Sequence, residues 1–289
     1  MKSQNAGLFL VLVIAAIFVS GCSQEELSQE ELKQMITETA EKVDTYKLDM
    51  NMEMKTVMSN ETESIEMTTF ISGNGAVDQE NRKMMMKLTT SLSGLEEKES
   101  FETEMEMYYI ESEMYMKMDM GVPEFPARWM KMKMPEENWE SQNQLDQQLE
   151  LLNVSEIEIL GSEEIDGIEC YVLKITPDME KLWEVITNRP GINEQMKELN
   201  DFDLGDIVKE TYVKYWITKD TKFPIKTLTR MKMELTPEIM STSDANVSGF
   251  QPSMTMDSEI EIKYYDYNEP VEIELPEEAR NATEFPMMI

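Results

Sequence analysis

The feature that most restricts the fold of this chain is a strict alternation between methionine and other residues. Between Glu113 and Met120 every second residue is methionine, and Glu, Tyr, Lys and Asp stand in the other positions. A similar alternation runs from Tyr46 to Met54. Because successive side chains of a β-strand point to opposite faces, a period of two predicts half-buried strands in both segments.

Further segments are also predicted to be strands, separated by polar or glycine-containing stretches. They cover residues 65–71, 84–88, 101–109, 129–134, 157–159, 168–175, 211–218, 223–235 and 254–267. Helical spacing of apolar residues predicts helices after a capping box at 28–31, at 142–152 and after Pro177. About ten strands with these helices predict an α+β fold built on one curved antiparallel sheet.

The N-terminus has the pattern of an exported protein. An apolar stretch from Leu8 to Val19 follows Lys2 and ends at Ser20, Gly21 and Cys22. The stretch is too short to cross about 30 Å of hydrocarbon but has the normal length of a secretory signal. Small residues directly before a cysteine resemble the lipobox of prokaryotic lipoproteins, in which the cysteine is lipidated. An ordinary signal peptide with an incidental cysteine, or an uncleaved anchor, is the alternative.

We therefore expect a signal peptide at residues 1–21, a lipidated tether at 22–28 and a single folded domain at 29–289. Cys22 is the expected lipid attachment site, which would hold the protein at the outer face of the cell membrane. The other cysteine, Cys170, lies in an apolar segment and is expected to be a buried thiol rather than a reactive one.

The composition is strongly acidic, with 26 basic residues, 58 acidic residues and a formal net charge of −32. A charge of this sign and size repels nucleic acid phosphates and anionic lipid headgroups. We therefore expect no nucleic acid partner. The link to the membrane is expected to be the lipid on Cys22 rather than a basic patch.

The chain contains no histidine, which excludes serine–histidine and cysteine–histidine nucleophilic sites and histidine-dependent zinc sites. With 58 acidic residues, carboxylate pairs are too common to indicate an active site. The sequence has no glycine-rich phosphate loop and no nucleotide-binding fingerprint. We expect no catalytic activity, no cofactor and no metal ion held by carboxylates or histidine.

Four asparagines begin Asn-x-Ser/Thr sequons, and their contexts are polar or loop-like. They are Asn60, Asn153, Asn246 and Asn281. In an exported chain these are permissive positions for N-glycosylation, provided that the organism has the machinery.

Three segments carry a family resemblance. They are residues 166–177, residues 215–231 with a strand, turn and strand around Trp216, Asp220 and Pro224, and residues 265–276. In these segments and in its order of predicted elements, the chain resembles the LolA and LppX/LprG-like superfamily of exported lipoprotein and lipid carriers. The resemblance implies an unclosed half β-barrel whose concave face is covered by helices and encloses an apolar cavity for acyl chains. The expected anchor distinguishes the chain from freely soluble carriers.

Together with the alternation, the resemblance implies a ligand cavity lined mainly by methionine. The expected lining residues are Met50, Met52, Met54, Met84, Met86, Met105, Met107, Met114, Met116, Met118, Met120, Met130, Met132 and Trp216. Unbranched thioethers keep rotamer freedom, so such a wall adapts to ligands of varied shape. The same residues equally suit a plain protein core.

The sequence therefore predicts a membrane-anchored extracytoplasmic lipoprotein that binds a lipid or another hydrophobic molecule. A ligand-free structural or protein-interaction lipoprotein is the first alternative, and the sequence identifies no particular protein partner. The second alternative is capture of a soft metal ion such as Cu(I) by thioethers. Residues i and i+2 of a strand lie about 6.5 Å apart. Capture of a soft metal ion therefore needs methionines from neighbouring strands.

Overall fold

The computed structural model describes residues 28–60, 62–94, 101–122, 125–134, 139, 151–187, 204–237 and 253–284. The expected signal peptide, Cys22, Asn246 and most of the helix predicted at 142–152 lie outside these residues. In the part of the chain that is described, no helix is both long and apolar enough to cross a membrane.

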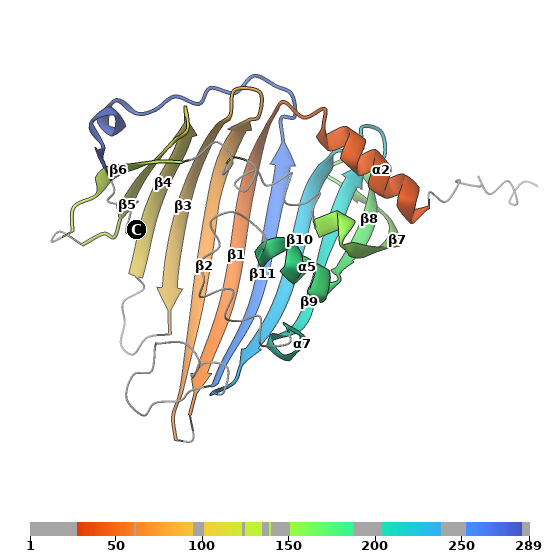
Figure 1. Ribbon diagram of the computed structural model, residues 1–289, viewed down its shortest axis with the longest axis horizontal. Helices are drawn as coiled ribbons and strands as arrows, with labels where there is room; N and C mark the ends of the chain where they lie inside the picture. Colours follow the sequence, from red (N-terminus) through yellow and green to blue (C-terminus); the bar gives the residue numbers. More distant parts are fainter. Residues whose placement is uncertain are drawn as a thin grey trace, which may run out of the picture.

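One twelve-stranded sheet dominates the fold (Figure 1). Its strands are β1 (Thr45–Ser59), β2 (Ser64–Asp78), β3 (Lys83–Ser93), β4 (Phe101–Ile110), β5 (Glu113–Asp119), β6 (Arg128–Lys133), β7 (Ser155–Ile165), β8 (Ile168–Pro177), β9 (Val208–Thr218), β10 (Pro224–Leu235), β11 (Ser253–Tyr265) and β12 (Thr283–Glu284). The described helices are α2 (Gln29–Ala40), α5 (Met179–Thr187), α7 (Leu204–Ile207) and the 3-10 helix η3 (Glu277–Asn281).

Two antiparallel meanders make up the sheet, whose spatial order is β12-β6-β5-β4-β3-β2-β1-β11-β10-β9-β8-β7. β1 to β6 lie in chain order on one side, and β7 to β11 lie in chain order on the other. The meanders join where β1 pairs with β11, from Lys47 opposite Tyr265 to Ser59 opposite Ser253. The first strand of the domain and its last long strand are therefore neighbours in the middle of the sheet.

The predicted curved antiparallel sheet is confirmed, and it is open, because β12 and β7 form two free ends of the strand order (Figure 1). The expected number of strands, about ten, is too low. One strand that the sequence did not indicate is β12, a two-residue segment that pairs in parallel with β6. The expected covering of the concave face by helices is not shown, although α2 packs against one end of the sheet.

α2 begins at the predicted capping box. The Ser28 side chain accepts a hydrogen bond from the Glu31 amide at 3.2 Å, and the Glu31 carboxylate accepts one from the Ser28 amide at 2.8 Å. The hydrogen bonds that the Ser28 amide and hydroxyl donate to the Glu31 carboxylate lower the pKa of this carboxyl. Leu32 and Ile36, one helical turn apart, pack with buried residues of β7, β8 and β9 such as Leu173. Burying each such side chain contributes about 1.5–3 kcal/mol.

The pairing register divides the sheet into two chemically different faces. Paired residues lie on the same side, so Met52 shares a face with its partners Ile71 and Ile260. Glu53 and its partner Glu259 lie on the opposite side. We call the side of Met52 and of the residues in register with it the methionine face, and the side of Glu53 the charged face.

The C-terminal tail lies on the charged face of the first meander. Ile273, which precedes η3, and Ala279 within η3 pack with Tyr108 of β4 and Trp129 of β6. β12 then pairs with β6, with Thr283 opposite Met130. The tail therefore covers an aromatic part of the charged face and reaches the outer edge of β6.

β7 forms the other edge of the sheet, and its pairing with β8 is irregular. The register shifts just before Gly161, whose φ of 135° is a conformation that a residue with a side chain rarely adopts. Glu156 and Glu158 of this strand are both exposed. At the start of the strand, the Lys33 side chain of α2 donates a hydrogen bond to the Ser155 carbonyl oxygen at 3.0 Å.

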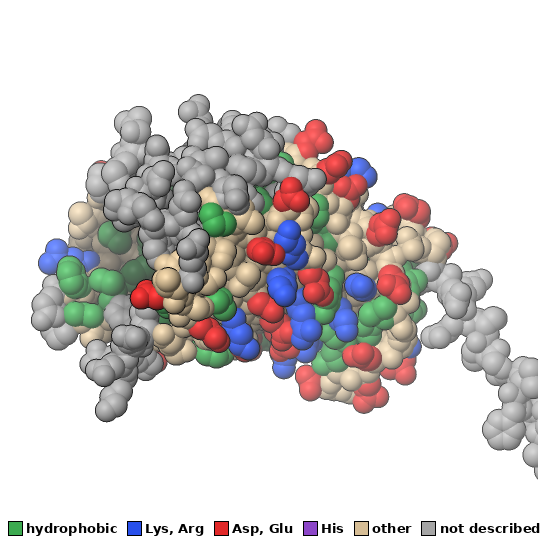
Figure 2. Space-filling model, turned by 90° about the horizontal axis from the view of Figure 1, so that it is seen from below, with side chains coloured by type: hydrophobic (Ala, Val, Ile, Leu, Met, Phe, Trp, Pro, Cys, Tyr) green, Lys and Arg blue, Asp and Glu red, His purple; other side chains and the backbone are tan. Residues whose placement is uncertain are grey.

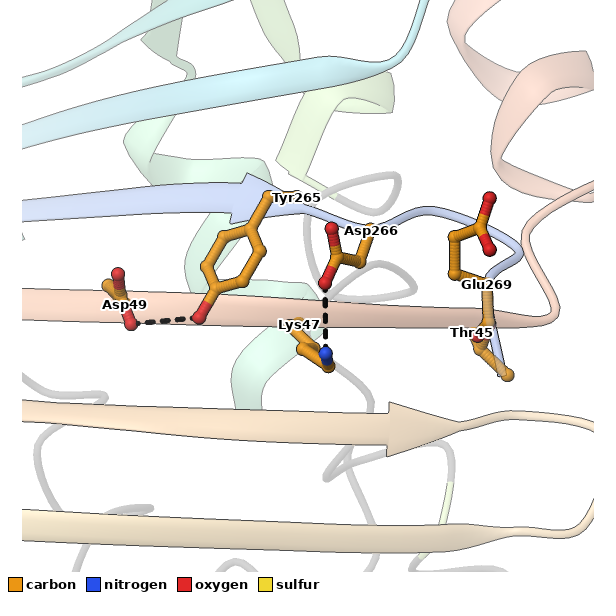
Figure 3. A network of polar contacts seen from close by, with 6 residues as sticks. All are labelled: Thr45, Lys47, Asp49, Tyr265, Asp266 and Glu269. Carbon is orange, nitrogen blue, oxygen red and sulfur yellow. Dashed lines mark hydrogen bonds and ion pairs between the residues drawn. The ribbon is translucent and has the colours of Figure 1, made fainter. Parts of the chain in front are cut away.

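The chain that leaves β11 is tied back to the start of β1 (Figure 3). The contacts are an ion pair of Lys47 with Asp266 at 2.9 Å, a hydrogen bond from the Tyr265 hydroxyl to Asp49 at 3.1 Å, and a hydrogen bond from the Thr45 hydroxyl to the Glu269 carbonyl oxygen at 2.6 Å. The ion pair is solvent-exposed and therefore stabilises little by itself. The contacts together fix the chain direction where the two meanders join.

An aromatic cluster lies at the same end of the sheet. Tyr267 stacks on Phe223 with ring centroids 4.6 Å apart, and Tyr46 lies close to both Tyr264 and Tyr267. The Tyr267 hydroxyl donates a hydrogen bond to the Pro224 carbonyl oxygen at 2.6 Å. Burial, with a smaller contribution from neighbouring tyrosines, raises the pKa of Tyr267 well above its usual value.

Replacing Tyr267 by phenylalanine is expected to make the fold less sensitive to alkaline pH. A phenol whose pKa is raised by folding stabilises the native state below its unfolded pKa of about 10, and this stability is lost as the pH rises above that value. Tyr267→Phe removes this alkaline loss. It also lowers the free energy of unfolding at neutral pH by about 1 kcal/mol, because the hydrogen bond to Pro224 is lost. Urea unfolding at neutral pH and at about pH 11 measures both effects.

The matched control is Tyr265→Phe, because the Tyr265 residue is 38% exposed and its pKa, raised by partial burial and by the hydrogen bond to Asp49, is shifted less far than that of Tyr267. This variant should lose stability at alkaline pH to nearly the same extent as the unchanged protein. An alkaline loss that is as large in Tyr267→Phe as in the control would contradict the prediction.

Candidate functional site

Methionine is segregated to one side of the sheet. Among the methionines of the described strands, all but Met85 lie on the methionine face. The expected cavity methionines within these strands are all on that face: Met50, Met52, Met54, Met84, Met86, Met105, Met107, Met114, Met116, Met118, Met130 and Met132. Met120 directly follows β5 and is half-buried.

Burial of the methionine face changes along the strands. At one end, Tyr46 is fully buried and Met84 and Met86 are each 6% exposed. Toward the opposite ends of their strands, Ile65 is 45% and Met118 is 42% exposed. The face is therefore closed at one end and open at the other.

The register also places methionines of neighbouring strands beside one another. Met107 of β4 is opposite Met116 of β5, which is opposite Met130 of β6. In the adjacent row, Met114 is opposite Met132. Directly opposed residues have Cβ atoms about 4.5–5.5 Å apart, which brings their side chains into contact.

Gly75 makes room for the next methionine in the first of these rows. Met86 of β3 is opposite both Gly75 of β2 and Met107 of β4. A Cβ added at Gly75 would collide with the Sδ atom of Met86. The thioether of Met86 therefore leans toward β2 and fills the space over Gly75.

The methionine face carries almost no charge. In the described strands β1–β6, β10 and β11, Arg128 is the one charged residue on this face, and it is exposed opposite Met118. The buried polar residues on the face are small; Ser258, for example, donates a hydrogen bond to the Met231 carbonyl oxygen at 3.3 Å. Covering such a face with apolar material leaves few polar groups without partners.

Trp216 lies on the opposite side of the sheet from the methionines. It pairs with Val172 of β8 and packs there with Cys170. Its indole nitrogen donates a hydrogen bond to the Glu163 carboxylate at 2.7 Å. Trp216 is therefore not part of the surface that the methionines form. Cys170 is fully buried, and burial raises the pKa of its thiol, as in an unreactive core cysteine.

Ion pairs between neighbouring strands cover much of the charged face. They include Lys226 with Glu261 at 2.6 Å, Arg230 with Glu259 at 2.5 Å, and Glu106 with Lys87 and Lys117 at 3.5 and 3.6 Å. Basic and acidic side chains are intermixed where the molecule is viewed from the lower ends of the strands (Figure 2). The parts of the charged face that carry these ion pairs therefore meet water rather than apolar material.

Three depressions lined by described residues open on the charged face, with volumes of about 350, 560 and 450 Å³. The walls of the first two are mainly polar or charged, with Lys55 and Arg230 in the first and Asp49 and Lys87 in the second, whereas Phe70 also lines the third. A methionine-lined cavity is not among these three. The open methionine face itself is therefore the candidate site.

Sequence reasoning missed several methionines of this face. They are Met58, Met67, Met231, Met233, Met254 and Met256, at the far ends of β1, β2, β10 and β11. The signal was present, because Met254 and Met256 alternate, as do Met231 and Met233. Only the register shows that Met254 lies opposite Met58.

Other expected sites lie apart from the methionine face. Asn60 sits in the β1–β2 turn, where its side-chain oxygen accepts hydrogen bonds from the Thr62 and Glu63 amides. Asn153 and Asn281 are exposed. Within the residues that the structure describes, no group of three or more histidine, cysteine or carboxylate side chains is placed to hold a metal ion.

Residues 28–284 match the model of a family described as "Family of unknown function (DUF6612)". Since this match covers most of the sequence, the chain belongs to that family. No curated protein matches the sequence.

Solved structures with a similar arrangement have low sequence identity. The Mycobacterium tuberculosis lipoprotein LppX is 12% identical with a TM-score of 0.42, and the alignment covers 86% of this chain and 100% of that chain. LprF from Mycobacterium bovis is 13% identical with a TM-score of 0.41, covering 86% and 97%. A LolA superfamily protein from Nitrosomonas europaea is 12% identical with a TM-score of 0.22, covering 84% and 94%. This likeness concerns the fold alone.

Replacing Met86 by lysine is expected to destabilise the domain by about 3–5 kcal/mol, because it buries an unpaired charge on the methionine face. The matched control is Thr89→Lys in the same strand. Thr89 lies on the charged face opposite Glu104, so its replacement should change stability by less than about 0.5 kcal/mol. Urea unfolding at neutral pH measures both. Equal effects of the two substitutions would contradict the assignment of the faces.

Proposed function

We propose that this protein is a membrane-anchored extracytoplasmic lipoprotein that binds a lipid or another hydrophobic molecule against its methionine face. The observation that carries the proposal is the combination of an almost uncharged face with apolar side chains that remain exposed at its open end. Ile65 and Met118, on two different strands, mark that end. An uncharged sheet face that carries exposed apolar side chains suits a ligand or a partner.

The residue type supports a binding role over rigid packing. Val and Ile are the usual residues of buried strand faces, and their χ1 angles are restricted. Methionine has an unbranched, polarizable side chain that adjusts to the shape of its neighbours. A methionine wall therefore suits a ligand whose acyl chains vary in length or saturation.

The N-terminal sequence supports export and anchoring. The apolar stretch that ends at Cys22 is the basis for placing the protein outside the cytoplasm, and a net charge of −32 disfavours direct attraction to anionic lipids. A lipid on Cys22 would hold the methionine face near a membrane that supplies its ligand.

The second candidate is a structural lipoprotein whose methionine face is covered by its own chain. The buried end of the face around Tyr46 and Met84 favours it, since those side chains already form a closed core. Occupancy of the open end separates the two candidates.

Purification of residues 23–289 without detergent from membrane-containing cells, followed by native mass spectrometry and solvent extraction, is expected to show a stoichiometric amphiphile. The protein stripped of this molecule should take up a fluorescent fatty acid. Met52→Glu should weaken that uptake at least about tenfold, because it places a charge in the middle of an apolar surface.

The control is Asn51→Glu, which introduces the same side chain one residue earlier on the charged face. This variant should bind as tightly as the unchanged domain. A native mass equal to that of the protein without ligand, together with no fatty acid uptake, would favour the structural candidate.

The anchor is tested separately by the mass of the N-terminal peptide. We expect the exported protein to begin at Cys22 and to carry a diacylglyceryl group, and Cys22→Ala to lack this group and to keep residues 1–21. Cys170→Ala is the control and should be lipidated normally. An unmodified N-terminus in the unchanged protein would remove the anchor from the proposal.

A further inference from the structure

Three methionines on three consecutive strands form one row across the first meander. Met107, Met116 and Met130 are directly paired through β4, β5 and β6. All three are half-buried, so they are neither locked in the core nor fully exposed to solvent. Met86, the next residue of the row, directs its sulfur toward Gly75 instead.

We propose that Met107, Met116 and Met130 form a binding site for a soft monovalent metal ion of the class of Cu(I) and Ag(I). Thioether sulfur is a soft ligand that selects such ions over hard cations. This site is distinct from lipid binding, because it depends on sulfur rather than on apolar surface.

The spacing between strands suits this coordination. A metal–sulfur bond of about 2.3 Å places three sulfurs of a trigonal site roughly 4 Å apart. Paired residues on neighbouring strands have Cβ atoms about 4.5–5.5 Å apart, and two flexible bonds separate Cβ from sulfur. The outer residues Met107 and Met130 lie two strands apart, about 9.5 Å at the backbone, so both side chains must turn toward Met116 to bring the three sulfurs to one ion.

The electrostatic setting also favours a cation. Thioethers are neutral, so the bound ion keeps its positive charge, and a chain with a net charge of −32 attracts it over a long range. Carboxylates do not compete at this position, because the acidic residues of β4 and β5 lie on the charged face.

The same face provides a matched control that lacks the row. Met50 and Met52 of β1 are also half-buried, but neither is opposite another methionine. The partners of Met52, for example, are Ile71 and Ile260. If the number of methionines alone determined binding, Met50 and Met52 would contribute to silver binding as much as Met107 and Met116.

Silver titration of the full chain in detergent tests the site, with Cys22→Ala and Cys170→Ala present throughout so that no thiol competes. Met107→Leu/Met116→Leu is expected to weaken the strongest Ag(I) site at least tenfold, because leucine keeps the apolar volume but removes the sulfur. Met50→Leu/Met52→Leu should stay within twofold of the parent chain. X-ray absorption of the silver-loaded parent should show a first shell of sulfur.

Unchanged Ag(I) affinity in Met107→Leu/Met116→Leu, equal losses in both double variants, or a first shell of oxygen would each overturn the proposal. Thermal unfolding confirms that each variant is folded. Fatty acid uptake of the unchanged protein is measured in a separate assay without silver, so its result does not depend on the metal titration. Failure of the metal site and failure of lipid binding are therefore distinguishable.

Discussion

The pairing of β1 with β11 is the constraint on which the rest of the sheet depends. It joins two meanders that otherwise share no strand contact along the strand order, and it runs almost the full length of both strands. If this pairing slipped by one residue, the methionines of one meander would lie on the same face of the sheet as the charged residues of the other meander. The contacts of Lys47, Thr45 and Asp49 with the end of β11 and the chain that follows it hold the register at one end (Figure 3). The continuous methionine face is a consequence of that register.

Strict alternation made much of this predictable from the sequence. Residues such as Met114 and Met116 are separated by polar residues, so their common face follows from the period of a strand. Trp216 could not be assigned in this way, because β9 is buried on both sides there and Tyr215, Trp216 and Ile217 are all apolar. Alternation has no meaning in a segment without polar residues, and only pairing with β8 determines the face.

The C-terminal tail was unpredictable for a different reason. Its apolar residues, such as Ile273, alternate with acidic ones and predict an extended segment, but they pack on Tyr108 and Trp129 without forming a strand. That position depends on an aromatic patch contributed by distant strands on an otherwise charged face. The row of Met107, Met116 and Met130 is likewise a property of register, which one-dimensional spacing does not contain.

The irregular β7 edge has a consequence for self-association. An open sheet offers unpaired backbone groups at its ends, where a second molecule can add strands without limit. At the end formed by β6, the tail supplies β12 and occupies part of the edge. At the other end, β7 has a register shift before Gly161 and exposes Glu156 and Glu158. A contact between two β7 strands would therefore bring irregular backbone and like charges together. A protein with a wide apolar face can therefore reach a high local concentration without growing into fibrils.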